Sequence, residues 1–269
     1  MKQTVGKNTF EKVSLTKGEM NVYDFGEIRL HAYKTNDFLS DEVFFFERAG
    51  RAVALEAPCF YDNYAELERY FAERGISVEA MLIAYHMCGG SFLSGVKKFA
   101  TENAVEYGLR GGGKNLKDGF VSAFGAAFDG TPHQITDVIG GGRIDICGIE
   151  FIITPTEEAF DVEIPAINAV YTHMLGHDCH SIVAGPAHAD AVIAQLEGYL
   201  KAGYTLILTS HYTPEDLKDV ETKIAYLRDL KAIAASCQDG AAFKAEVQKK
   251  YPGYSGENYL DMTAGFFFA

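Results

Sequence analysis

Three apolar segments of this chain have the length and composition of buried strands, and a histidine stands close behind each of them. The segments cover residues 81–85, 164–170 and 204–208, and the histidines are His86, His173 and His211. A lone histidine after a strand is usually a local hydrogen-bonding residue. In a layered α/β fold, however, loops that follow neighbouring strands meet at one edge of a sheet. Three histidines at equivalent strand ends therefore predict a shared site at that edge.

The second of these histidines opens the densest cluster of polar side chains in the chain. His173, His177, Asp178, Cys179 and His180 lie within eight residues, although the whole chain has only eight histidines. Histidine and aspartate are common ligands of zinc and similar ions, so this spacing is typical of a metal or catalytic site. The same residues can instead form a hydrogen-bonded polar cluster, because neutral imidazoles also join buried groups without any metal. The spacing alone leaves both interpretations open.

Composition excludes two classes of partner. The 269 residues carry a formal net charge of −13, whereas nucleic acids and anionic membranes both need a basic protein face. The five cysteines are scattered and form no Cys-x-x-Cys pair, which fits a reduced cytosolic protein better than a disulfide scaffold. We see no apolar signal segment at the start and no apolar run of membrane-spanning length. We therefore expect a cytoplasmic protein whose partner is a small-molecule substrate or ligand.

The remaining pattern predicts one domain over residues 1–269, because no repeat, low-complexity segment or flexible linker interrupts the chain. Helical spacing of apolar residues predicts helices over 64–71, 92–106 and 186–201. Thr213, with Pro214 at the first helical position, predicts the start of another helix. Alternating apolar residues predict short strands, which cover 28–32, 43–46, 52–55, 143–147 and 149–153.

The glycine-rich section over residues 108–142 is the least regular part of the sequence. Its glycine clusters favour loops between short strands, since glycine supports tight turns. The stretch 111–115 (Gly-Gly-Gly-Lys-Asn) lacks both the spacing and the Gly-Lys-Ser/Thr ending of a phosphate-binding loop. A flexible turn is the expected use of these glycines.

The order of these segments resembles the metallo-β-lactamase superfamily, nearest its alkylsulfatase-like branch. The similarity runs from about residue 22 to residue 230, and the family fold implies an α/β protein, an αββα sandwich of two mixed sheets flanked by helices. In that branch a Thr-Glu-Ala segment precedes an acidic ligand, and this chain has 155–159 (Pro-Thr-Glu-Glu-Ala) followed by Asp161 and Glu163. His173 stands where the branch has a second acidic ligand, and His211 matches the last histidine of the superfamily.

The sequence departs from the family at its hallmark motif, His-x-His-x-Asp-His. Without a gap, its four ligand positions fall on Met87, Gly89, Ser91 and Phe92; a shift of one residue places His86, Cys88, Gly90 and Ser91 there. A bridged pair of metal ions needs about four ligands from this motif. The resemblance therefore implies a remodelled site that holds one ion rather than two.

Two hypotheses follow. In the first, the protein is a metal-dependent hydrolase with one zinc ion, which acts on an ester, sulfate ester, phosphoester or amide. The zinc ligands would be His86, His173 and His211, with Cys88 or Glu163 as the fourth, while Asp178 or His177 moves the proton. In the second hypothesis, the protein binds a small ligand or regulates a partner, and it has kept the fold but lost the metal.

Overall fold

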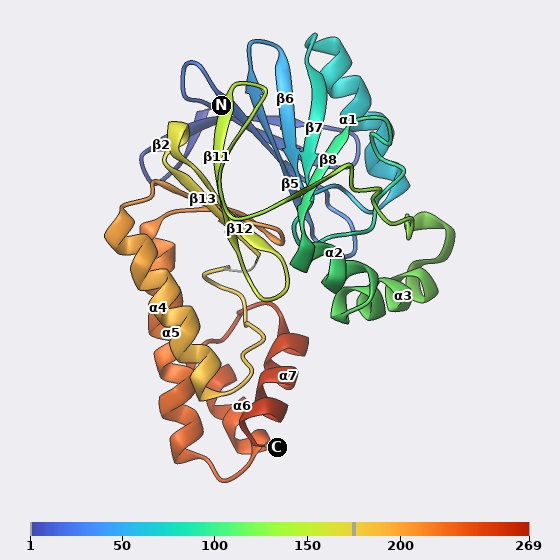
Figure 1. The fold of residues 1–269 in the computed structure, drawn as a ribbon. Helices are drawn as coiled ribbons and strands as arrows, with labels where there is room; N and C mark the ends of the chain where they lie inside the picture. The colour runs from blue at the N-terminus through green and yellow to red at the C-terminus, as the bar shows by residue number, and fades with distance from the viewer. Residues whose placement is uncertain (1, 174–175, 269) are drawn as a thin grey trace.

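Two β-sheets pack face to face in the computed structural model, which describes residues 2–173 and 176–268. Helices cover the outer face of each sheet, so that the layers run helix, sheet, sheet, helix (Figure 1). Within the described residues the first sheet has nine strands, in spatial order β1 (Lys2–Val5), β2 (Asn8–Ser14), β3 (Glu19–Asp24), β4 (Arg29–Lys34), β5 (Glu42–Arg48), β6 (Arg51–Leu55), β7 (Ser77–Leu82), β8 (Lys97–Thr101) and β9 (Asp137–Ile139). This is the αββα arrangement that the family resemblance implies.

The second sheet is also mixed. Over the same described ranges it has six strands, β10 (Gly142–Ile146), β11 (Ile149–Pro155), β12 (Phe160–Ile164), β13 (Ala169–Thr172), β14 (Leu206–Thr209) and β15 (Tyr212–Glu215). β13 and β14 run parallel, and the other neighbours in this sheet are antiparallel. In the first sheet β1 to β6 are antiparallel, while β6 to β9 run parallel.

The helices lie between and after these strands (Figure 1). They are α1 (Tyr61–Glu73), α2 (Glu102–Leu109), α3 (Gly112–Phe124), α4 (Pro186–Ala202), α5 (Leu217–Ser236), α6 (Gly240–Lys250) and α7 (Glu257–Phe267), with short 3-10 turns at Gly125–Ala127 and Pro165–Ile167. Among the described residues, no helix combines the length and the apolar character that a membrane crossing requires.

The aromatic run in β5 shows why the sequence forms these layers. Side chains alternate between the two faces of a strand, so Phe44 and Phe46 point towards the second sheet and Phe45 towards α1. The ring of Phe46 meets Phe151 of β11 with centroids 5.5 Å apart, while the ring of Phe45 meets Phe71 of α1 at 4.6 Å. An apolar run that is buried on both faces thus ties an outer helix to the core between the sheets.

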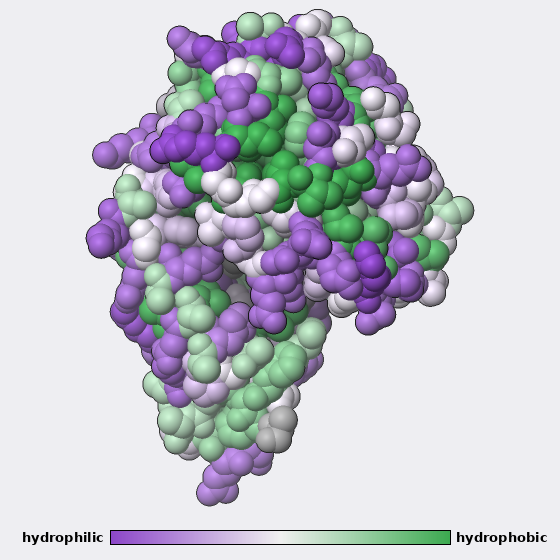
Figure 2. Space-filling view, in the orientation of Figure 1, coloured by the Kyte–Doolittle hydropathy of each residue, from purple (hydrophilic) through white to green (hydrophobic). Residues whose placement is uncertain are grey.

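The outer face of the second sheet is covered by the C-terminal helices. Val170 of β13 and Ile207 of β14 are buried there, in a cluster with Leu196 of α4 and Leu227 of α5. Some hydrophobic side chains stay at the surface away from the C-terminal helices, and Figure 2 shows them as a green band over the upper part of the molecule, between strands of the two sheets. Val138 of β9 is 66% exposed.

The apolar run over 164–170 is not one strand: β12 ends at Ile164, a 3-10 turn covers Pro165–Ile167, and β13 begins only at Ala169. Three other local predictions are wrong. The expected helix over 92–106 begins only at Glu102, because residues 97–101 form β8 and pair in parallel with β7 and β9. The glycine-rich section contains α3 rather than only loops and strands. Leu116, Phe120 and Phe124 recur there at a spacing of four residues, which suits a helix despite the glycines.

The third correction concerns the helix expected to begin at Pro214 with Thr213 as its cap. Thr213 and Pro214 belong to β15, and α5 begins after Asp216. The side chain of Asp216 accepts hydrogen bonds from the N–H groups of Lys218 and Asp219, and the Asp219 side chain accepts one from the Asp216 N–H. This reciprocal capping box outweighs the proline signal.

Candidate metal centre

Three imidazole rings meet where three strands end. His86 follows β7, His173 follows β13 and His211 follows β14. The Nε2 atom of His211 lies 3.2 Å from the Nε2 atom of His86 and 3.2 Å from that of His173. One nitrogen from each ring falls within 4.8 Å of the other two. The expectation that these histidines lie together is confirmed; their role as metal ligands stays a prediction.

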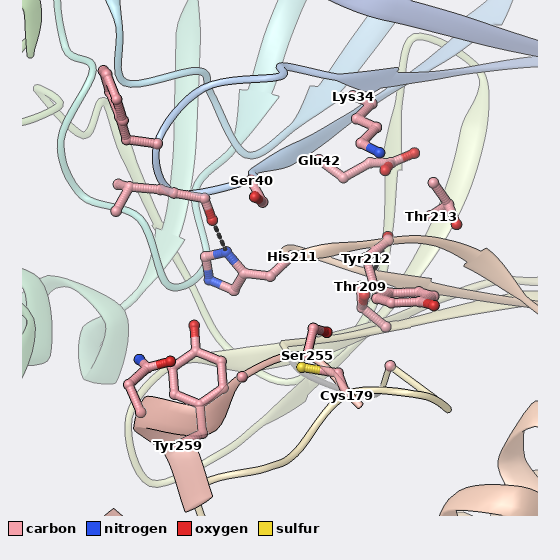
Figure 3. A pocket seen from close by; sticks show the side chains of 15 residues that line it. Lys34, Ser40, Glu42, Cys179, Thr209, His211, Tyr212, Thr213, Ser255 and Tyr259 are labelled. Carbon is pink, nitrogen blue, oxygen red and sulfur yellow. Dashed lines mark hydrogen bonds between the residues drawn. The ribbon is translucent and has the colours of Figure 1, made fainter. Parts of the chain in front are cut away.

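The Nδ1 atom of His211 faces the turn before β5. His211 Nδ1 donates a hydrogen bond to the carbonyl oxygen of Leu39 at 3.3 Å, which Figure 3 shows as a dashed line, and lies 3.1 Å from Asp41 Oδ1. A carbonyl oxygen only accepts, so the proton of a neutral His211 belongs on Nδ1. Nε2 then carries a free lone pair that points towards the other two rings, as metal binding requires.

A buried carboxylate fixes the backbone that carries His86. Glu56 follows β6, is fully buried, and accepts hydrogen bonds from the N–H groups of Tyr85 at 2.7 Å and His86 at 3.2 Å. The hydroxyl of Tyr171 donates to the same carboxylate at 2.8 Å. Glu56 also has a positive φ of 64°, a strained conformation for a residue with a side chain. Strain is retained here because three donors hold the carboxylate in place.

His173 and His211 are tied to each other through the backbone. The N–H of Ser210 donates to the carbonyl oxygen of His173 at 3.0 Å, which extends the parallel pairing of β13 and β14 beyond the strand ends. Glu42 N–H donates to the Ser210 carbonyl at 2.6 Å. The ring of Tyr85 stacks on that of His173 with centroids 4.2 Å apart and an interplanar angle of 9°. The three rings are therefore held by both sheets.

The surroundings shift the pKa values of these groups in opposite directions. Burial, followed by the nearby His211 and His86, puts the pKa of His173 well below its ordinary value of 6.5. Burial also acts to lower the pKa of His211, but the Asp41 carboxylate outweighs it and raises that pKa. For Asp41 itself burial acts upward, yet the charges of His86 and His211 lower its pKa. At neutral pH the site therefore contains a neutral His173 and an ionised Asp41.

Two cavities open at the three histidines. One, of about 410 Å³, is lined by His86, His173, His211 and Asp41 together with mostly apolar side chains. The other, of about 480 Å³, is lined by polar side chains and again by His211. In Figure 3 the His211 ring projects into this second cavity between Ser40 and Tyr259. His211 thus borders both cavities, while His86 and His173 border only the apolar one.

The structure brings neither proposed fourth ligand into the group of three imidazoles. Glu163 pairs with Val170 across β12 and β13, and both residues lie on the outer face of the sheet, away from the inter-sheet core. Cys88 lines the apolar cavity, but its Sγ atom lies 3.2 Å from the Sγ atom of Cys59. Within the described ranges, neither side chain offers an atom to the cluster of three.

The two residues expected to move the proton lie in another cluster, against β15 and α5. His177 Nδ1 lies 2.9 Å from Glu215 Oε1 and 3.4 Å from Asp219 Oδ1. Glu215 is buried, and its two oxygens also accept the N–H groups of Gly176 and His177. Asp178 is exposed and accepts a hydrogen bond from the Tyr212 hydroxyl. This second group of possible metal-binding side chains is satisfied by its own ion pairs and holds the loop in place.

Sequence reasoning overlooked Asp41, Glu56 and Tyr85, which support the three rings. A signal was present for Glu56, because the segment 56–59 (Glu-Ala-Pro-Cys) stands where the family usually has Asp-Gly after its third strand. Asp41 had no such marker, since nothing near it in the chain connects it to residue 211.

Comparison with known proteins defines the class of fold. No family profile matches the chain, and no curated protein matches it in sequence. Among solved structures, the fold is that of the metallo-β-lactamases: a metallo-β-lactamase family protein from Thermus thermophilus has a TM-score of 0.59 and 13% identity over 88% of this chain and 90% of its own.

A second similar structure is the stereoselective inverting sec-alkylsulfatase Pisa1 from Pseudomonas sp. It has a TM-score of 0.61 and 15% identity, over 92% of this chain but only 49% of its own. The chain thus spans about half the length of that alkylsulfatase. At such identities the similarity establishes the predicted metallo-β-lactamase fold, while activity and ligands rest on the residues of the site.

Proposed function

We propose that the protein is a metal-dependent hydrolase with a single zinc ion held by His86, His173 and His211. One observation carries this proposal: the Nε2 atoms of three imidazoles, from three separate strand ends, converge at the wall of the apolar cavity. Catalytic zinc sites commonly use three protein ligands and leave a further position for water or substrate.

The residues present fit such an ion. The Leu39 carbonyl and Asp41 fix the Nδ1 side of His211, as the outer partners of a metal-binding histidine do. The low pKa of His173 keeps that ring neutral at physiological pH, and only neutral imidazole binds a metal. The buried carboxylates of Asp41 and Glu56 supply negative charge around the cluster. A zinc ion bound here would supply Lewis acidity and lower the pKa of a coordinated water.

The chain's own residues supply the remaining functions. Asp41 lines the apolar cavity, and its Oδ2 atom has no hydrogen-bond donor among the described side chains and backbone. Because Asp41 Oδ1 lies beside Nδ1 of His211, on the side of the ring away from Nε2, Asp41 acts through His211 as a positioning residue. Asp178 and His177, which the sequence suggested for proton transfer, lie near β15 and α5. Glu56 and Tyr85 keep His86 and His173 in position.

Metal stoichiometry is the direct test. Elemental analysis of protein purified without chelator, followed by calorimetric titration of metal-stripped protein with zinc, should give one tight site per chain. His211→Ala should abolish it, while His188→Ala is the matched control, because His188 is exposed on α4 and its Nδ1 accepts the N–H of Ala184. Cys88→Ser should retain zinc, since the Cys88 thiol lies against Cys59.

The reaction itself is tested with 4-nitrophenyl esters, sulfates and phosphates on the same protein. Hydrolysis that zinc restores after chelation supports the hydrolase. No zinc binding by the folded protein would instead favour the metal-free binding protein, in which the 3.2 Å Nε2 contacts are hydrogen bonds between neutral histidines.

A further inference from the structure

We infer that the substrate is an uncharged amphiphile, an aliphatic chain joined through an ester to a hydroxylated head group. This inference rests on the proposed hydrolase function and specifies what the site binds. It starts from a property of the apolar cavity: apolar side chains from elements far apart in sequence surround it. They are Phe38 and Leu39 before β5, Leu116 and Phe120 of α3, and Tyr259 and Met262 of α7.

Several of these side chains are largely exposed to water, which is unfavourable in free energy for an apolar group. Phe38 is 77% exposed, Leu116 55% and Met262 48%, which makes them three of the largest exposed apolar residues described. Single exposed apolar residues are common, but three that line one cavity from three elements form a hydrophobic patch of the kind that marks a binding site. The cavity of about 410 Å³ has the size of a small-molecule site and ends at the imidazoles. A flexible aliphatic chain matches this shape and polarity.

The charges around the cavity argue against an anionic head group such as a sulfate or phosphate. Two buried carboxyl groups lie beside the imidazole cluster: Asp41, 3.1 Å from His211 Nδ1, and Glu56, which accepts the N–H of His86. The cation among the described residues that line the apolar cavity is Lys117, and its amine lies 3.2 Å from Asp118 on the same helix. Among those described residues, no unpaired cation is left for an anionic head group. An uncharged ester therefore enters at lower electrostatic cost than an anion.

The second cavity has the opposite character and suits the head group. Hydroxyl groups line it, from Ser40, Thr209, Thr213, Ser255 and Tyr259. Glu42, only 1% exposed, lines it as well, and its Oε1 atom lacks a hydrogen-bond partner among the described groups. A buried oxygen without a donor is costly, so a ligand hydroxyl that reaches Glu42 gains a hydrogen bond that the free protein lacks.

Glu42 does not favour a cationic head group. Burial raises its pKa well above the ordinary value, which disfavours the ionised form, and Lys34 stands opposite it in the β4–β5 pairing, where Figure 3 shows the two side chains near each other at one end of the cavity. Neutral hydroxyls, as in a small polyol, fit this carboxyl and the nearby amine better than an ammonium does.

His211 lines both cavities, so a molecule that reaches from one to the other presents its middle to the imidazoles. For an ester, water adds its oxygen to the carbonyl carbon and the C–O bond to the head group breaks. One proton of the water stays on the acid that forms, and the other passes to the departing alkoxide. The products are a carboxylic acid in the apolar cavity and a polyol in the polar one, and no oxidant or cofactor is consumed.

Binding of non-hydrolysable glycerol ethers tests the inference apart from catalysis. Calorimetry with 1-O-butyl-, hexyl- and octylglycerol, each below its micelle concentration, should show affinity that rises about fourfold per methylene. Octyl sulfate and octyltrimethylammonium should bind at least tenfold more weakly than octylglycerol. Leu116→Asp and Met262→Asp should weaken octylglycerol tenfold or more. Val138→Asp is the control, because Val138 is at least as exposed as Leu116 and Met262 but lies on β9 outside both cavities.

The outcomes separate this inference from the proposed function. If zinc-dependent hydrolysis of 4-nitrophenyl esters is equally fast for short and long acyl chains, the aliphatic substrate is overturned and the hydrolase proposal stands. Octyl sulfate that binds as tightly as octylglycerol would overturn the uncharged head group. Tight octylglycerol binding by a protein that never binds zinc would overturn the ester, since the amphiphile would then be cargo. Hydrolysis of 1-octanoylglycerol that is faster than that of 1-butanoylglycerol, and slowed by Leu116→Asp, supports the inference.

Discussion

The carboxylate of Glu56 accepts a hydrogen bond from the backbone N–H of His86 across 3.2 Å. The two residues come from the ends of neighbouring parallel strands, β6 and β7, and Glu56 also receives the N–H of Tyr85 and the hydroxyl of Tyr171. One buried acid thus connects the first sheet to the second directly beneath the imidazoles. The histidines meet because this acid fixes the turn that carries one of them.

Glu56→Gln should therefore weaken zinc without unfolding the protein. The amide keeps the size of the side chain, but its NH₂ group cannot accept the N–H of Tyr85 or His86, so the turn loses an acceptor. Outer residues that orient a metal ligand typically contribute tenfold or more to affinity, and we expect about a tenfold loss in zinc titrations.

Glu163→Gln is the control for that experiment, because Glu163 lies on the outer face of β12 and should not affect zinc. Equal losses in the two variants would contradict the role assigned to Glu56. They would instead return Glu163 to the position of fourth ligand that the sequence allows.

The sequence pattern was sufficient to predict that the three histidines meet, for a physical reason, whereas the order of the layers came from the family resemblance. Apolar runs such as Phe44–Phe45–Phe46 must be buried on both faces, and the loops after such strands collect at sheet edges. His86, His173 and His211 follow directly from that rule.

The supporting residues could not be predicted in the same way. Asp41 meets His211 across 170 positions of sequence, and only the folded sheets place them 3.1 Å apart. In α3, glycine content hid a helix whose apolar residues face a cavity rather than a filled core, so local composition and final environment disagree. Long-range juxtaposition of this kind leaves no local trace in the chain.

Zinc affinity should depend on pH through His211. Burial lowers the pKa of this imidazole, but Asp41 outweighs burial and raises the pKa above 6.5. Zinc needs the neutral ring, so protons compete as the pH falls through the raised pKa, and affinity should begin to drop already above pH 6.5. In Asp41→Asn the raising charge is gone, so the drop should start at lower pH.

Asp41→Asn should also lower hydrolytic activity, because His211 loses the carboxylate that orients its ring. We expect a fall in kcat of about tenfold for the zinc-loaded variant. Calorimetry from pH 5.5 to 8 and kinetics at pH 8 measure the two effects separately. A pH profile of zinc binding identical to that of the native protein would show that Asp41 does not control His211.

A further prediction concerns Asp129, which holds the turn behind Cys88. Its carboxylate accepts hydrogen bonds from the N–H groups of Ser91 and Thr131, at 2.9 and 3.0 Å, and from the hydroxyl of Tyr64 at 2.8 Å. Burial acts to raise its pKa, but these hydrogen bonds prevail and lower the pKa to about 2. Asp129→Asn should reduce the free energy of unfolding at pH 7 by about 2 kcal/mol.

The sign of the pH dependence follows from that lowered pKa. Stability from a carboxylate with a depressed pKa is complete above its unfolded value of about 4 and is lost as the pH falls towards 2. The difference between native protein and Asp129→Asn in urea denaturation should therefore shrink between pH 4 and pH 2. Asp118→Asn, at an exposed ion pair on α3, is the control and should change stability by less than about 0.5 kcal/mol.

The start of α5 gives the last prediction. Asp216 accepts the N–H groups of Lys218 at 2.7 Å and Asp219 at 3.2 Å, while Thr213 lies within β15. Asp216→Ala leaves these donors at the helix start without their side-chain acceptor and should lower the free energy of unfolding by about 1 kcal/mol. Thr213→Ala should change it by less than half as much, because no helix begins there. Urea denaturation of both variants decides the matter: a larger loss for Thr213→Ala would place the helix start at Pro214 after all.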